Sequence, residues 1–173
     1  MRITPDTKDW TWVLERPCEE CGYNAQDFPR ETFARIIRVV AAKWTPVLQR
    51  SDVRDRASES TWSALEYGCH VRDVYRIFDG RLAKMLAEDN PLFQNWDQDE
   101  TALVERYDLQ EPSIVNDELQ KAASDYADRF GAVAETDWTR PGTRSNGSHF
   151  TVTSLGSYSL HDLIHHLWDV STT

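Results

Sequence analysis

Apolar residues recur with a helical period over four long stretches of the chain. These stretches run from about 27 to 48, from 58 or 60 to about 88, from 113 to about 133, and from 157 to 170. In each, a spacing of three and four residues places the apolar side chains on one face, which a helix buries against a core. Asp27 and Ser113 suit the N-cap positions of the first and third stretches. The pattern therefore predicts four long helices.

The segments between the helices are shorter or irregular. Residues 1–26 show no long period and are expected to form an irregular lead-in whose Trp10 and Trp12 pack onto the body. Asp99–Tyr107 predicts a short helix, and Phe150–Thr153 a short extended segment before the last helix. We expect an all-α fold, a single-domain antiparallel four-helix bundle over the whole chain.

The last predicted helix carries three of the five histidines. His161 and His165 are four residues apart, so their side chains stack on one helix face and can bind one metal ion. An apolar stripe runs beside that pair, made up of Leu160, Leu163, Ile164 and Leu167. Asp162, His166 and Asp169 fall on the opposite, polar side, so His166 is predicted to point away. The alternative is a pair of histidines hydrogen-bonded to neighbours at the edge of a core.

His70 lies one position off the apolar stripe of the second helix. Glu66 and Asp73 share its face, and either carboxylate could orient the imidazole, serve a bound metal or act as a base. A salt-bridged histidine on the helix surface is the alternative. If the second and last helices lie side by side, His70, His161 and His165 can close on one ion and leave open positions, as in catalytic sites.

Cys18 and Cys21 form a C-x-x-C followed by glycine, which resembles half of a zinc knuckle. A structural zinc needs four ligands, and no second pair of cysteines or histidines lies near this motif in the sequence. A redox role would need a strand-to-helix context that is missing. A plain turn with two half-buried thiols, a metal site and a redox pair all stay open.

Composition narrows the functional class. The 19 basic and 29 acidic residues give a formal charge of −10, which argues against nucleic acid or an anionic membrane as a partner. No apolar run is long enough to span a membrane, and residues 1–10 lack the apolar core of a signal peptide. Three cysteines do not make a disulfide framework. A cytoplasmic protein that acts on a small-molecule substrate is expected.

The order of motifs is similar to that of the DinB/YfiT-like superfamily. The resemblance rests on Trp62-Ser-x-x-Glu-Tyr-x-x-His70, a long connection, and His161-x-x-x-His165 within a last helix that follows Phe150-Thr-Val-Thr. It spans roughly residues 30–170, and the lead-in with Cys18 and Cys21 is an addition. It implies a four-helix bundle, often a dimer, with a divalent zinc or nickel ion on His70, His161 and His165.

The resemblance also implies a range of activities. Relatives include transferases and isomerases that depend on the thiols mycothiol or bacillithiol, and metal-dependent hydrolases. We therefore expect a metal-dependent enzyme, with Glu66 or Asp73 assisting the site. Arg140 and Arg144, in the loop before the last helix, could clamp a carboxylate-bearing substrate or a low-molecular-weight thiol; their alternative is solvent-exposed loop charge.

Two other functional classes compete with the enzyme. One is a non-catalytic bundle with a structural metal, and the other is a thiol- or zinc-responsive protein that uses Cys18 and Cys21. An open coordination position beside the ion favours the enzyme.

Overall fold

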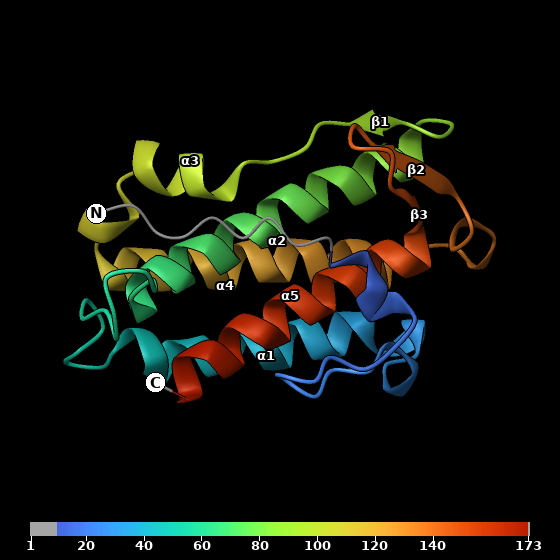
Figure 1. Ribbon diagram of the computed structural model, residues 1–173. Helices are drawn as coiled ribbons and strands as arrows, with labels where there is room; N and C mark the ends of the chain where they lie inside the picture. Colours follow the sequence, from blue (N-terminus) through green and yellow to red (C-terminus); the bar gives the residue numbers. More distant parts are fainter. Residues whose placement is uncertain (1–9, 173) are drawn as a thin grey trace.

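The computed structural model describes residues 10–172, which form five α-helices and a small three-stranded sheet (Figure 1). The helices are α1 (Phe33–Leu48), α2 (Ala64–Ala87), α3 (Gln98–Val104), α4 (Pro112–Gly131) and α5 (Val152–Thr172). The strands are β1 (Leu92–Phe93), β2 (Pro141–Arg144) and β3 (His149–Thr151). The four predicted long helices are confirmed, and the short extended segment is β3. The fold is mostly helical, as expected, but it is not strictly all-α, because β3 belongs to a three-stranded sheet.

The four long helices are not all antiparallel to their neighbours. Arg72 of α2 pairs with Glu118 of α4, and Asp79 of α2 pairs with Arg129 of α4, so α2 and α4 run in the same direction. Helices α2 and α5 run in opposite directions, and α1 and α2 lie diagonally across the bundle, each packed against α4 and α5 (Figure 1). The predicted antiparallel topology was therefore wrong for α2 and α4. It was also wrong for α1 and α5, because Phe33 lies beside Gly156 near their starts and Arg50 donates to the Val170 carbonyl near their ends.

The long connection between α2 and α4 explains why these two helices run in the same direction. It contains β1 and α3 and passes over the bundle, so the chain is back near the start of α2 before α4 begins (Figure 1). A short loop would have placed α4 antiparallel to α2.

Local hydrogen bonds set where the helices begin. The Ser63 hydroxyl accepts from the Glu66 N–H and the Glu66 carboxylate accepts from the Ser63 N–H, a capping box that starts α2 after the predicted Ser58 or Ser60. Thr151 and Ser154 exchange the same kind of bonds, so α5 begins before the predicted Ser157.

Two other predicted starts differ from the structure. Two short 3₁₀ turns, at 25–27 and 30–32, occupy the predicted beginning of α1. At α4, Pro112 takes the first helical position and Ser113 lies inside the helix.

The small sheet caps one end of the bundle. Strand β1 pairs parallel to β2, and β2 pairs antiparallel to β3 through a turn in which Gly147 has a φ of +92°, a left-handed conformation that favours glycine. The sheet is joined to the end of α2, because Arg140 donates to the carbonyls of Met85 and Glu88.

The irregular lead-in packs onto the bundle as predicted. Trp10 and Trp12 are partly buried against the core, and their rings stack with centroids 5.6 Å apart. Tyr23 is buried, and its hydroxyl donates to the Ser157 carbonyl of α5 over 2.7 Å.

Within residues 10–172, none of the helices has both the length and the apolar character needed to cross a membrane. Residues 1–9, on which the argument about a signal peptide largely rests, lie outside the described part of the chain.

Candidate metal centres

Helix α5 presents its histidines to two different neighbours. Two groups of potential metal ligands occur in the part of the chain that the structure describes, each with donor atoms within 4.8 Å of one another. One consists of His70, Asp162 and His166, and the other of Cys18, Cys21, His161 and His165. Successive residues of an α-helix point about 100° apart, so the pair 162/166 faces α2 while the pair 161/165 faces the lead-in.

The first group joins α2 to α5. Asp162 Oδ1 lies 2.9 Å from His166 Nε2 and 3.6 Å from His70 Nε2. The rings of His70 and His166 are nearly perpendicular, with centroids 4.7 Å apart. Two imidazole nitrogens and a carboxylate oxygen thus converge on one point between the helices.

His70 is enclosed by aromatic rings. Trp96, from the long connection, stacks on it with an interplanar angle of 4° and a centroid distance of 5.3 Å, and Trp62 packs at 5.2 Å. The His70 side chain is fully buried, yet neither of its ring nitrogens has a hydrogen-bond partner among the described residues. An unpartnered buried imidazole is costly, so this group fits a metal ion on its chemistry.

Two carboxylates hold His166 in one orientation. Its Nδ1 bonds to Asp169 Oδ2 over 2.8 Å, which directs Nε2 toward Asp162. Burial favours neutral His166, but the bonds to Asp162 and Asp169 outweigh it and raise its pKa to about 9. Burial likewise lowers the pKa of His70, whose interaction with Asp162 opposes the shift only in part.

The second group joins the lead-in to α5. Cys18 Sγ lies 3.7 Å from His165 Nδ1, and the rings of His161 and His165 have centroids 5.1 Å apart. Cys18, His161 and His165 are buried and Cys21 is partly buried. Burial lowers the pKa of His161 to about 4 and raises the pKa of Cys21 to about 11.

The structure therefore divides the histidines that the sequence grouped together. His161 and His165 lie together as expected, whereas His70 lies with Asp162 and His166. The face of α5 predicted to be solvated is largely covered, since His166 retains 17% and Asp162 24% of its side-chain exposure. Helix α2 covers that face. The sequence-based prediction assumed that the last helix buries only the face with the apolar stripe, so it did not anticipate this contact.

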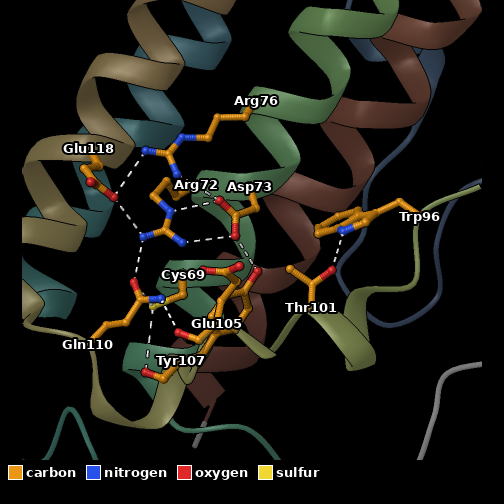
Figure 2. A network of polar contacts seen from close by, with 10 residues as sticks. All are labelled: Cys69, Arg72, Asp73, Arg76, Trp96, Thr101, Glu105, Tyr107, Gln110 and Glu118. Carbon is orange, nitrogen blue, oxygen red and sulfur yellow. Dashed lines mark hydrogen bonds and ion pairs between the residues drawn. The ribbon is translucent and has the colours of Figure 1, made fainter. Parts of the chain in front are cut away.

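The two carboxylates predicted to assist His70 bond elsewhere. Glu66 caps α2 and forms an ion pair with Arg56. Asp73 accepts two bonds from Arg72, one from Arg76 and one from the Tyr107 hydroxyl, the last over 2.5 Å (Figure 2).

Arg72 is the centre of this polar network. Its guanidinium also donates to Gln110 and Glu118, so it links α2, α4 and the connection between them (Figure 2). Burial would raise the pKa of Asp73, but Arg72 and Tyr107 outweigh it and lower that pKa. The network reads as structural.

Arg140 and Arg144 lie in and beside the small sheet. The Arg140 guanidinium donates to the Met85 carbonyl. At a rise of about 1.5 Å per residue, Met85 lies about 22 Å along α2 from His70, so Arg140 is far from the first ligand group. Arg144 donates to Asn146 and Ser148, and its guanidinium lies over the rings of Phe150 and Tyr158. Neither arginine belongs to either ligand group.

Asp162 and His166 are the site residues that the sequence reasoning left out. Their signal was present, because they share the spacing of four residues that marks His161 and His165. Choosing between the two pairs requires the position of α2 around α5.

The fold and these groups define a helical-bundle protein with the residues to bind metal. The chain belongs to the DinB superfamily, whose family model matches residues 38–170. Among solved structures, the chain is similar to YfiT from Bacillus subtilis, described as a probable metal-dependent hydrolase with an unusual four-helix bundle topology. The identity is 17% and the TM-score 0.73, over 83% of this chain and 86% of YfiT, so this likeness establishes the fold. None of the curated proteins compared with the chain matches it.

Proposed function

We propose that this protein is a divalent-metal-dependent hydrolase and that His70, Asp162 and His166 hold its ion. The observation that carries the proposal is the fully buried His70, whose ring nitrogens have no hydrogen-bond partner within residues 10–172 while its Nε2 lies 3.6 Å from the Asp162 carboxylate. Two imidazoles and a carboxylate are a common ligand set of hydrolytic zinc sites and also suit iron.

The exposure of the three ligands supports a catalytic site over a structural one. His70 is fully buried, but Asp162 and His166 keep part of their side chains accessible. Three protein ligands leave a coordination position for water or substrate. When bound, the ion would supply Lewis-acid chemistry that lowers the pKa of a water and makes a nucleophile near neutral pH.

The chain's own residues prepare this site. Asp169 holds the Nδ1 proton of His166, so that the Nε2 of His166 is left to bind the ion. Trp96 and Trp62 exclude water around His70, which strengthens electrostatic interactions there. The bonds to Asp162 and Asp169 raise the pKa of His166, so an ion on its Nε2 would compete with the proton that these bonds favour.

Hydrolysis is the reaction that the description of YfiT suggests, and the thiol-dependent transfer or isomerisation expected from the family resemblance is the alternative. A set of His70, His161 and His165 is the alternative ligand set. It would bring together residues that belong to two separate ligand groups.

A panel of chromogenic esters, amides and phosphodiesters tests the function. We expect turnover with bound zinc, manganese or nickel, its loss on chelation and its loss in Asp162→Ala, with Cys69→Ser as a control outside both groups. Turnover that survives Asp162→Ala would contradict the proposal. Turnover that requires an added low-molecular-weight thiol would favour the transferase alternative.

A further inference from the structure

We propose that Cys18, Cys21, His161 and His165 form a second metal site, a structural zinc site that joins the lead-in to α5. This site is independent of the ion proposed for catalysis, because the two groups share no ligand. Two cysteines and two histidines are a complete set of four ligands for tetrahedral zinc.

The positions of the four side chains carry this inference. Their donor atoms lie within 4.8 Å of one another although they come from segments more than 130 residues apart in the sequence. The Nε2 of His161 is buried and has no hydrogen-bond partner in the described part of the chain. A zinc ion would satisfy that nitrogen together with the neighbouring sulfurs.

Two carboxylates lie near the ring nitrogen of His165 that faces away from Cys18. The Nε2 of His165 lies 3.5 Å from Glu20 Oε2 and 3.8 Å from Asp169 Oδ1, while its Nδ1 faces Cys18 Sγ. In many zinc sites the ring nitrogen opposite the metal bonds to a carboxylate, which fixes the other nitrogen as the ligand. Glu20 lies between the two cysteines in the sequence, so the same turn supplies both thiols and this carboxylate.

The cysteines lie on a tight turn. The Cys18 carbonyl accepts from the Gly22 N–H over 2.9 Å, and the Cys18 N–H donates to the Tyr23 carbonyl over 2.8 Å. Gly22 has a φ of +73°, which favours glycine directly after the second cysteine. This turn brings both sulfurs to the same side of the backbone, next to α5.

The charge and enclosure of the site suit a structural ion. Two thiolates and two neutral imidazoles balance the charge of Zn²⁺, so the complex is neutral in its buried position. Trp10 packs against the rings of both histidines, at 5.2 Å from each, and Tyr23 packs against His161. With four protein ligands the ion has no open position, so its role is to hold the lead-in in place.

Cobalt substitution distinguishes this site from the other. Co²⁺ bound to thiolates shows a sulfur-to-cobalt charge-transfer absorption that a site of two histidines and an aspartate does not show. We expect this absorption when the reduced, metal-free full-length chain is titrated with Co²⁺. It should be absent in Cys18→Ser/Cys21→Ser and unchanged in His70→Ala. Cys69→Ser is the matched control, because Cys69 is a buried cysteine outside both groups and should keep the absorption.

Further outcomes guard against misfolded variants. Cys21→His keeps four ligands and should still bind the ion, with a weaker absorption. In the zinc-loaded wild-type chain, chelation should speed cleavage after Glu19 or Glu20 by a glutamate-specific protease. No charge-transfer absorption in the wild type, or an absorption that persists in the double cysteine variant, would overturn the proposal. Cysteines that form a disulfide and exclude Co²⁺ even under reducing conditions would also overturn it.

Discussion

His165 and His166 are adjacent in the sequence but belong to different groups. Their rings are perpendicular, with centroids 5.9 Å apart, because successive residues of α5 point in different directions. Asp169 is hydrogen-bonded to His166, and the carboxylate of Glu20 lies 3.5 Å from the Nε2 of His165. One turn of helix can therefore supply ligands to two ions without sharing a side chain.

We predict that the ion pair between Arg72 and Asp73 stabilises the folded protein. Their side chains are 6% and 13% exposed, and Asp73→Ala would leave the Arg72 guanidinium without its two-bond partner. We expect a loss of about 3 kcal/mol in the free energy of unfolding, measured by urea denaturation. The control is Asp108→Ala, which removes an exposed pair with Arg106 and should cost less than about 1 kcal/mol.

The same pair predicts a pH dependence. The folded-state pKa of Asp73 lies below its unfolded value, so its stabilisation is present above the ordinary carboxylate pKa of about 3.9 and is lost as pH falls through the lower, folded pKa. The stability difference between wild type and Asp73→Asn should therefore shrink on acidification. A difference that is constant from neutral pH to pH 3 would contradict this account.

At the scale of residues, the sequence identified most of the candidate ligands but not which of them lie together. The spacing of His161 and His165 was visible, and so was the C-x-x-C of Cys18 and Cys21. Their proximity was not, because it depends on how the irregular lead-in folds back over α5. The roles expected of Glu66 and Asp73 rested on their sharing a helix face with His70, whereas both carboxylates have arginine partners.

At the scale of elements, α5 approaches the rest of the core closely at Gly156. A Cβ at this position would lie 2.9 Å from Phe130 Cζ and closer still to the ring of Phe33. We expect Gly156→Ala to destabilise the protein by about 1–3 kcal/mol through overpacking.

Gly80 provides the matched control for this substitution. It also lies in a helix, but a Cβ there would meet nothing within 4 Å. Gly80→Ala should stabilise the protein by about 0.5–1 kcal/mol, because alanine has the higher helix propensity. Equal thermal shifts for the two variants would show that the contact at Gly156 is relaxed without cost.

The helices themselves were predictable from periodicity, but their directions were not. A spacing of three and four residues indicates a buried face and carries no information about which neighbour is parallel. The parallel packing of α2 and α4 depends on the path of residues 88–111, where β1 is only two residues long. Such a short strand has no detectable alternation, so the sheet could not be anticipated.

At the scale of the whole molecule, α5 is the element that both proposed sites share. It packs against both α2 and the lead-in (Figure 1). His70 lies on α2, and Cys18 and Cys21 lie in the lead-in. An ion in the second site would fix the lead-in against the same helix that carries Asp162 and His166. The structural metal considered from the sequence would then be the ion on Cys18, Cys21, His161 and His165. The metal-dependent enzyme would use the ion on His70, Asp162 and His166.

The central claim is that this chain holds two metal ions in two separate groups. The most direct test is the metal content of untagged protein, purified without chelator, for wild type, His70→Ala, Cys18→Ser/Cys21→Ser and the combination of all three substitutions. We predict two equivalents, one, one and none, respectively, with the remaining ion in each case retained by the intact group. A single equivalent in the wild type that is lost in His70→Ala but kept in the cysteine variant would contradict the account. Loss of that same ion in a further variant, His161→Ala, would favour one three-histidine site.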